Sequence, residues 1–275
     1  MTDRHTLDVA ELTLGYDDKD IVKAVSTNIP TGRITAIIGA NASGKSTLLR
    51  GVARLLKPRK GSVVLDGKAV HDMRSLDVAK IIGLLPQSPV APESITVGDL
   101  VSRGRYPHQG WFARWNAEDD RAVADALDAT GTAELVDRKL TQLSGGQRQR
   151  VWIAMALAQG TDILLLDEPT TYLDINYQVE VLDLLTDLNH RTGTTIVMVL
   201  HELNLACRYA DHVIAMKQGE IVVEGDPSDV ITAEVVEDVF KLQCDVMPCP
   251  RSGTPMVIPL GRHRLVEKEK VDAAG

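Results

Sequence analysis

The segment from Arg33 to Leu56 constrains the fold of this chain more than any other stretch. An apolar run, Arg33 to Ile38, leads directly into Gly39-Ala40-Asn41-Ala42-Ser43-Gly44-Lys45-Ser46-Thr47, and Lys45 to Leu56 has the pattern of a helix. A strand, a loop with the spacing GxxxxGK[ST] and a helix, in this order, indicate a phosphate-binding loop within an α/β sheet.

This loop predicts nucleotide binding. Its glycines would let backbone N–H groups curl around phosphate oxygens, and the N-terminus of the following helix adds a favourable dipole. Lys45 would reach the β- and γ-phosphates, and the Ser46 hydroxyl would ligate Mg²⁺. A glycine-rich turn before a helix is the alternative, but a chance match is on the order of one in a hundred at average glycine content.

Two further apolar runs, Ile163 to Leu166 and Thr194 to Leu200, predict strands of a parallel sheet buried on both faces. Asp167 and Glu168 follow the first run, at the edge where ligands of open α/β sheets bind. Asp167 would hold Mg²⁺, and Glu168 would orient or deprotonate the attacking water. An acidic pair after a strand is also common as a solvated turn, so the assignment depends on the phosphate loop.

Two more polar residues follow predicted strands. His201 comes directly after Thr194 to Leu200, and Gln87 comes just after the short apolar run Ile81 to Leu85. Their position predicts that both reach the same edge of the sheet, where Gln87 could contact Mg²⁺ and water. A structural hydrogen bond for His201 and a simple Pro-Gln turn are the alternatives.

Tyr16 lies in an early loop, after an expected strand from Leu7 to Leu14. Its ring could stack on a nucleotide base, although a structural role for a solitary aromatic residue is equally compatible. The chain has no Asn-Lys-x-Asp segment, which would read guanine. Adenine is therefore the expected base.

The stretch Leu143-Ser144-Gly145-Gly146-Gln147 has a chance frequency well below about one in a thousand. It has the properties of a second phosphate-facing helix start, because Ser144 offers a hydroxyl, the two glycines allow close approach and a helix begins near Gln147. A chain with one phosphate loop has no evident need for two such N-termini. The second one would therefore serve a nucleotide held by another copy of the chain.

Between Ser88 and Leu140 the apolar strands give way to helical periodicity, clearest at Asn116 to Ala129, which predicts an inserted helical subdomain. Two hairpins are expected elsewhere, one with an Asp66-Gly67 turn and one with the turn at 217–220. The tail beyond Lys241 is interrupted by Pro248, Pro250 and Pro255.

Composition excludes several classes of protein. With 275 residues, 44% of them hydrophobic, the chain can bury a sizeable core, and its net charge of −8 argues against a nucleic-acid partner. No apolar run approaches the ~18 residues that a membrane span needs, and Met1 to Pro30 lacks a signal-peptide pattern. The odd cysteine count without CxxC spacing favours a reduced compartment. We therefore expect a cytosolic protein, and any association with a membrane would come through partners.

Together these residues resemble the ATP-binding-cassette (ABC) ATPases over nearly the whole chain. The resemblance implies a head-to-tail dimer in which each ATP lies between one phosphate loop and the partner's Ser144, Gly145 and Gly146. Glu168 would be the general base, and His201 would hold the γ-phosphate. Asp174 would cross the dimer interface. The family's landmarks occur here in order: Tyr16, the loop to Thr47, Gln87, Leu143–Gln147, Asp167-Glu168, Asp174 and His201.

The same resemblance implies the fold class: α/β, with a P-loop NTPase core of parallel sheet flanked by helices, an antiparallel β subdomain and an inserted helical subdomain. The ATPase domain is expected to span 1–245, with the helical subdomain at about 88–140. The C-terminal tail, 246–275, is expected to belong to the same unit. Gln87 and the helical subdomain would transmit the conformational change of dimer closure to a membrane partner.

Within the family, three segments look like the ATPase subunits of iron–siderophore importers. This implies that ATP hydrolysis energises uptake of an iron(III)-siderophore through a separate permease, supplied by an extracytoplasmic binding protein. A haem or cobalamin importer is the near alternative, and a soluble cassette ATPase or a non-hydrolysing nucleotide switch is the alternative from another class. The three segments are Gly104 to His108, Pro169 to Ile175 and His201 to Ala206.

Two positions depart from the family's usual pattern. Ala42 stands where glycine is more usual, and Glu202 follows the histidine where aspartate is frequent. Neither change removes a phosphate or metal ligand, so activity is expected to survive. The aromatic residues Trp111, Phe112 and Trp115, interleaved with Arg114, predict either packing inside the helical subdomain or a docking surface for the transmembrane subunit.

Overall fold

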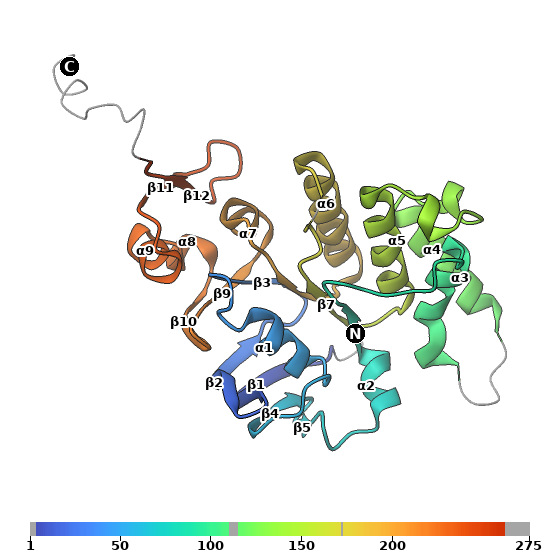
Figure 1. Cartoon of the computed structure of the whole chain (residues 1–275), viewed down its shortest axis with the longest axis horizontal. Coiled ribbons are helices and arrows are strands. Elements are labelled where there is room, and N and C mark those ends of the chain that lie inside the picture. Colours follow the sequence, from blue (N-terminus) through green and yellow to red (C-terminus); the bar gives the residue numbers. More distant parts are fainter. Residues whose placement is uncertain (1–3, 110–114, 172, 262–275) are drawn as a thin grey trace, which may run out of the picture.

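The computed structural model describes residues 4–109, 115–171 and 173–261. A six-stranded sheet with the strand order β10-β9-β3-β8-β7-β6 lies at its centre (Figure 1). Neighbouring strands are parallel except at the β10 edge, where β10 runs antiparallel to β9. The strands are β3 (Ile34–Gly39), β6 (Ile82–Leu85), β7 (Ile163–Asp167), β8 (Thr195–Val199), β9 (His212–Lys217) and β10 (Glu220–Gly225).

Both faces of this sheet are buried, which explains the continuous apolar runs in its strands. In β7, Leu164 and Leu166 pack into one apolar cluster, and Ile163 and Leu165 pack into another on the opposite face. Alternate side chains of a strand point to opposite faces, so a strand covered on both sides needs apolar residues throughout. The helices that contribute to the first cluster include α5 (Gly145–Ala158), α6 (Ile175–Thr192) and α7 (Leu203–Tyr209).

The second face is covered by α1 (Lys45–Val52) and by a four-stranded antiparallel sheet of order β2-β1-β4-β5 (Figure 1). The predicted fold class is therefore confirmed. The predicted Asp66-Gly67 hairpin is present as well, whereas β2 was not recognised in the sequence. The strands are β1 (Leu7–Tyr16), β2 (Lys19–Ile29), β4 (Lys60–Leu65) and β5 (Lys68–Ala69).

The helix α1 is shorter than predicted. The sequence suggested a helix as far as Leu56, but α1 ends at Val52 because Arg54 adopts a left-handed backbone conformation with φ of 61°. The N–H groups of Leu55 and Leu56 then both donate to the carbonyl of Arg50. The sequence after Val52 does not predict this turn, because its leucines fit a continuing helix equally well.

Three helices gather at one side of the sheet: α3 (Val97–Ser102), α4 (Ala117–Ala129) and α5 (Figure 1). Leu100 of α3, Leu127 of α4 and Ile153 of α5 belong to one apolar cluster. We propose that the helical subdomain, expected at about 88–140, includes α5. The helix α2 (Ser75–Ile81) precedes β6, and short 3-10 turns occupy Arg103–His108, Ala133–Leu135 and Leu140–Gln142.

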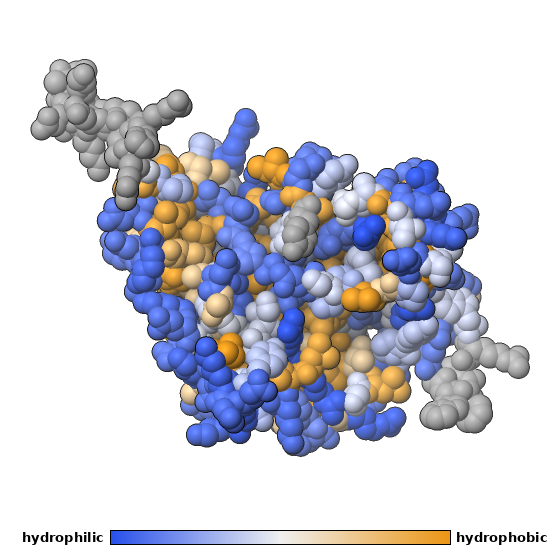
Figure 2. Space-filling model, in the orientation of Figure 1, coloured by the Kyte–Doolittle hydropathy of each residue, from blue (hydrophilic) through white to orange (hydrophobic). Residues whose placement is uncertain are grey.

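The C-terminal part contains α8 (Pro227–Val230), α9 (Ala233–Phe240) and a hairpin of β11 (Cys244–Pro248) and β12 (Pro255–Pro259). This hairpin packs against α7 and α9. The visible face of the molecule is largely hydrophilic, with apolar colour gathered over α8 and α9 (Figure 2). None of the helices in the described ranges combines the length and the apolar character that crossing a membrane requires. Trp111, Phe112, Arg114, Tyr172 and the end of the tail from 262 lie outside the described residues.

Candidate functional site

The phosphate loop connects β3 to α1, as predicted. Gly44 precedes the helix with φ of 104°, and no side chain caps the helix N-terminus. The Lys45 Nζ donates to the carbonyls of Gly39 and Ala40, at 2.9 and 3.0 Å, which folds the side chain back along the loop. Because the first N–H groups of α1 lack a capping side chain, they remain available to an anionic ligand.

A neighbouring turn supports the loop from behind. The N–H of Gly219, in the turn between β9 and β10, donates to the carbonyl of Ser43 at 2.9 Å, and the Gly219 carbonyl accepts from the N–H of Lys23 in β2 at 2.9 Å. A Cβ at Gly219 would lie 2.2 Å from the Ile21 carbonyl oxygen, so only glycine fits between the loop and β2. The turn therefore joins the phosphate loop to the antiparallel sheet.

Ser46 and Asp167 form the part of the site that suits a metal ion. The Ser46 hydroxyl donates to Asp167 Oδ1 at 2.7 Å, and Asp167 is 2% exposed. Burial raises the pKa of Asp167, and the negative charge of Glu168 also raises it. The hydrogen bond from Ser46 acts to lower this pKa, but the net shift is upward. A buried carboxylate beside a hydroxyl is a donor set that Mg²⁺ favours.

Glu168 is held by three side chains. Gln87 Nε2 lies 2.6 Å and the Thr171 hydroxyl 2.9 Å from Glu168 Oε2, and His201 Nε2 lies 2.6 Å from Oε1. Burial alone would raise the pKa of Glu168, but the hydrogen bonds from His201, Thr171 and Gln87 prevail and lower it. Its backbone adopts φ of 56°, a left-handed conformation that is uncommon for a glutamate. Strain of this kind gathers at functional sites.

Lys45 shares this electrostatic environment. Burial lowers its pKa, while the charges of Glu168 and Asp167 act to raise it. The buried Ser43 hydroxyl, also in the loop, has no hydrogen-bond partner within the described part of the chain. A buried polar atom without a partner is costly, and a bound phosphate would supply one. The residues present therefore fit both a nucleotide phosphate and Mg²⁺.

These groups surround an open pocket of about 970 Å³. Tyr16 lines this pocket and is 42% exposed, so its ring is accessible for stacking on a base, and its hydroxyl accepts from Arg50 at 3.3 Å. Three predicted residues do not line the pocket but contact residues that do. Asp167 accepts a hydrogen bond from Ser46, and the carbonyls of Gly39 and Ala40 accept from Lys45. The predicted residues that line the pocket are Tyr16, Asn41, Ala42, Ser43, Gly44, Lys45, Ser46, Thr47, Gln87, Glu168 and His201.

Sequence reasoning missed several lining residues. Thr171 contacts Glu168 directly, and Gln218 belongs to the turn that supports the loop. The others come from the start of β2, which the sequence did not reveal as a strand, so no signal could have placed them beside the phosphate loop. They are Lys19, Asp20, Ile21 and Lys23.

The predicted residues Ser144, Gly145, Gly146, Gln147 and Asp174 do not line this pocket. Ser144 caps α5 in a reciprocal pair: its hydroxyl accepts from the N–H of Gln147 at 3.3 Å, and Gln147 Oε1 accepts from the N–H of Ser144 at 3.1 Å. Asp174 caps α6 by accepting from the N–H of Tyr177 at 3.2 Å. Within one chain these residues start helices, and their role toward nucleotide remains a prediction.

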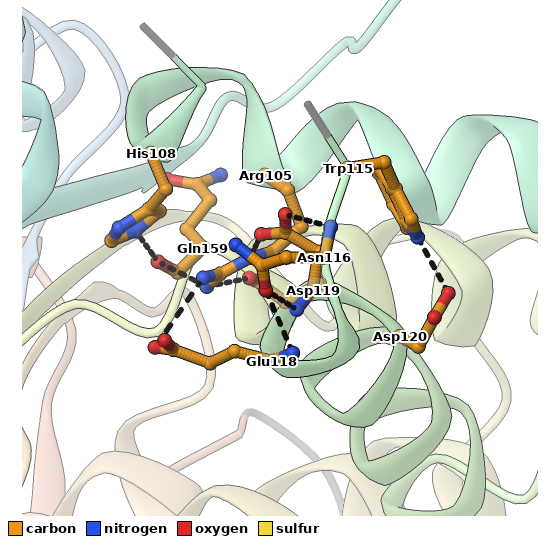
Figure 3. Close-up of polar contacts among 9 residues, drawn as sticks. Arg105, His108, Trp115, Asn116, Glu118, Asp119, Asp120 and Gln159 are labelled. Atoms are coloured by element: carbon orange, nitrogen blue, oxygen red, sulfur yellow. Dashed lines mark hydrogen bonds and ion pairs between the residues drawn. The ribbon is translucent and has the colours of Figure 1, made fainter. Parts of the chain in front are cut away.

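A polar cluster anchors the part of the helical subdomain that carries Trp115 (Figure 3). The Arg105 guanidinium, 4% exposed, donates to Asp119 Oδ1 at 2.8 Å and to the Ala158 carbonyl at 3.0 Å. Trp115 is 41% exposed, and its indole N–H donates to Asp120. The cluster thus connects the Arg103–His108 turn to the start of α4 and to the end of α5.

The site geometry agrees with the comparisons with known proteins. A family model described as ABC transporter matches residues 22–171, more than half of the chain. The chain belongs to the ABC transporter family. The predicted family is therefore confirmed.

Relatives of this ABC protein include ATP-binding proteins of iron-siderophore transport, which confirms the predicted resemblance to that subgroup. The petrobactin import ATP-binding protein FpuD of Bacillus anthracis is 51% identical over 97% of this chain and 98% of its own. The ferric enterobactin transport ATP-binding protein FepC of Escherichia coli is 52% identical over 92% of this chain and 93% of its own. A solved dimeric structure of a bacterial ABC transporter cassette has a TM-score of 0.72 and 30% identity, covering 80% of this chain and 98% of its own.

Proposed function

We propose that this protein is the ATP-hydrolysing subunit of an ABC importer and energises uptake of an iron(III)-siderophore through a separate permease. The observation that carries the proposal is the position of Glu168. Its carboxylate lies at the end of β7, lines the same pocket as the phosphate loop, and is held by Gln87, Thr171 and His201. This arrangement provides a base beside the place where a terminal phosphate would bind.

The roles follow from position. The loop from Gly39 to Thr47 would bind the phosphates, with Lys45 beside the β- and γ-groups, and Tyr16 would stack on adenine. Ser46, Asp167 and Gln87 would hold Mg²⁺, which neutralises charge on the phosphates when bound. Glu168 would accept a proton from the attacking water, and His201 would contact the γ-phosphate.

Both oxygens of Glu168 are engaged by hydrogen-bond donors. A carboxylate that accepts several hydrogen bonds and whose pKa is lowered is a weaker base than a free one. Movement of His201 and Gln87 toward bound ligand would free the carboxylate.

The active unit would be a head-to-tail dimer. Ser144, Gly145 and Gly146 lie at the start of α5, outside the pocket of their own chain, where they are free to face a nucleotide held by a second copy. The dimeric cassette that resembles this chain supports such an assembly. Asp174, at the start of α6, would lie at the interface between the copies.

Two relatives at nearly equal identity are named for different siderophores, petrobactin and ferric enterobactin. This similarity across different cargoes supports siderophore import as the class. Selectivity would then reside in the permease and in an extracytoplasmic binding protein. The subunit would work at the cytoplasmic face of the membrane, attached through that permease. The exposed Trp115 would contribute to the permease-docking surface; if Trp115→Ala assembled and transported normally while folded, this part of the proposal would fail.

Glu168→Gln tests the hydrolytic function. The variant keeps the size of the side chain but removes the base, so it should bind ATP with unchanged affinity and lose steady-state turnover. A soluble nucleotide switch without catalysis would show no turnover in the wild type either. Unchanged hydrolysis by Glu168→Gln would contradict the role assigned to this residue.

A further inference from the structure

His201 owes its position to the backbone on either side of it. The ring is 38% exposed, and among the described residues its only hydrogen-bonding side-chain partner is Glu168. On one side His201 follows β8, where the N–H of Leu200 donates to the Ile37 carbonyl at 3.2 Å. On the other side it is followed by Glu202 and α7.

The start of α7 lacks the usual means of fixing a helix end. Glu202, the residue before the helix, makes no side-chain cap. In contrast, Ser144 caps α5 and Asp174 caps α6 with side-chain oxygens. An uncapped seven-residue helix is prone to fray at its first turn, and a fraying turn beside His201 would let the imidazole move.

Asn204, the second residue of α7, compensates through a contact with a distant part of the chain. Its Oδ1 accepts from the N–H of Val257 at 2.7 Å, and its Nδ2 donates to the carbonyl of the same residue at 3.2 Å. One side-chain amide thereby pairs with both backbone groups of a single residue in β12. Two bonds to one residue fix direction as well as distance.

The strand that receives this contact is itself well anchored. The Val257 side chain is 4% exposed and packs, with Cys244 of β11, into the apolar cluster that also contains Leu164 and Leu166 of β7. Val257 also pairs with Val246 across the hairpin. The C-terminal hairpin therefore presents a rigid backbone edge to α7.

We infer that Asn204 and the β11–β12 hairpin position His201 for hydrolysis. Asn204 touches no part of the nucleotide pocket and is a positioning residue, acting through the first turn of α7. The inference rests on the proposed function, since it concerns the residue expected to contact the γ-phosphate. The C-terminal hairpin lies beyond residues 22–171, the segment that the family model matches, and by this inference it contributes to ATP turnover.

A double-mutant cycle on the full chain tests this. In Asn204→Ala we expect kcat for ATP to fall about tenfold, because displacement of a reacting group by ~1 Å costs up to a hundredfold. The dissociation constant for ATP should stay unchanged, since the phosphate loop is untouched. In a His201→Ala background, Asn204→Ala should cause no further loss of kcat, because residues that act as a unit are not additive.

Two further variants separate positioning from general stability. Tyr209→Phe removes the 2.8 Å bond from the other end of α7 to Asp183 and should leave kcat unchanged. Asn204→Asp keeps the oxygen that accepts from Val257 but sets a carboxylate oxygen against the Val257 carbonyl, so kcat should fall here too, even if Asn204→Ala folds poorly.

The outcomes distinguish the two proposals. Wild-type kcat in both Asn204 variants, or an equal loss of kcat with and without His201, would overturn the positioning role while hydrolysis itself stands. A folded wild-type chain without ATPase activity, or His201→Ala with undiminished turnover, would overturn the proposed function together with this inference.

Discussion

His201 Nε2 lies 2.6 Å from Oε1 of Glu168, while the donors of Gln87 and Thr171 both reach the other oxygen, Oε2. The two oxygens thus have different partners. Gln87 and His201 come from the ends of different strands and are candidates to move toward ligand. Thr171 lies three residues from Glu168 in the same loop, so its hydroxyl can stay with the carboxylate throughout.

Thr171 is therefore expected to tune the acid side of the pH profile. The pKa of Glu168 is lowered against the effect of burial by His201, Thr171 and Gln87, so the base stays ionised into mildly acidic solution. Thr171→Val removes one donor and should raise this pKa. The acid limb of kcat should then move to higher pH, measured as ATPase rate between about pH 4 and 8.

Thr192→Val provides the control for Thr171→Val. Its hydroxyl donates to the Leu188 carbonyl within α6, away from the pocket, so the same chemical change should leave the pH profile in place. If the acid limb of Thr171→Val coincides with that of the wild type, the hydroxyl does not act on Glu168.

The sequence predicted the centre of the sheet and the residues at its ends well. The runs at β7 and β8 are apolar because both faces are buried, and the residues after them, Glu168 and His201, meet in the pocket as expected. These signals are local, since each depends on one strand and the residue that follows it. The phosphate loop was equally clear, because its glycine spacing is set by its own backbone.

The edges of the molecule were harder to predict. β2 pairs with β1 through several register shifts, so its polar and apolar residues do not alternate cleanly. Pro248 and Pro255 suggested a broken tail, but they pair with each other at the ends of β11 and β12, next to the turn. Contacts such as Asn204 with Val257, 53 positions apart, depend on tertiary packing and leave no local pattern.

Ala42 is expected to carry backbone strain at the phosphate loop. It adopts φ of 61°, at the position where glycine is more usual in the family. A left-handed backbone costs a residue with a Cβ about 1–2 kcal/mol, and a glycine adds about 0.4–1 kcal/mol of entropy to the unfolded chain. Ala42→Gly should therefore raise the free energy of unfolding by about 0.5 kcal/mol with hydrolysis preserved.

Chemical denaturation of Ala42→Gly, together with an ATPase assay, measures both effects. Ala42→Val makes the opposite test, because a β-branched side chain tolerates this conformation poorly and should lower both stability and ATP affinity. Clear destabilisation by Ala42→Gly would show that the alanine is not strained.

The buried pair of Arg105 and Asp119 should be costly to break from one side. Arg105→Met leaves the Asp119 carboxylate, 2% exposed, without its guanidinium partner, and loss of one member of a buried pair costs about 3–5 kcal/mol. Arg105→Met with Asp119→Leu should recover much of that loss, since no unpaired charge remains. Urea unfolding measures the difference, and equal losses in the single and double variants would contradict it.

The same pair predicts a direction for acid sensitivity. The hydrogen bond from Arg105 is the main cause of the lowered pKa of Asp119, with burial acting against it. A carboxyl group whose pKa is lower in the folded state stabilises the protein above its unfolded pKa, and this contribution is lost as pH falls through the folded value. The gap in unfolding free energy between the wild type and the double variant should therefore narrow on acidification below about pH 4.

Ser144 gives the sharpest test of the composite site. Its hydroxyl caps α5, outside the pocket formed by its own phosphate loop. Ser144→Arg places a bulky cation where the γ-phosphate of a partner-bound nucleotide would lie. Hydrolysis should be lost while ATP binding by a single chain is retained, measured as turnover and as a dissociation constant on the same preparation.

Loss of a helix cap alone costs typically about 1 kcal/mol, and a matched variant removes this ambiguity from the Ser144→Arg test. Thr232 caps α9 in the same manner, with its hydroxyl accepting from the N–H of Val235 at 3.3 Å, and it lies outside the pocket. Thr232→Arg should lower stability by a similar amount and still hydrolyse ATP. If Ser144→Arg and Thr232→Arg turn over ATP equally, α5 contributes nothing to a second chain's nucleotide, and each subunit hydrolyses ATP without the other.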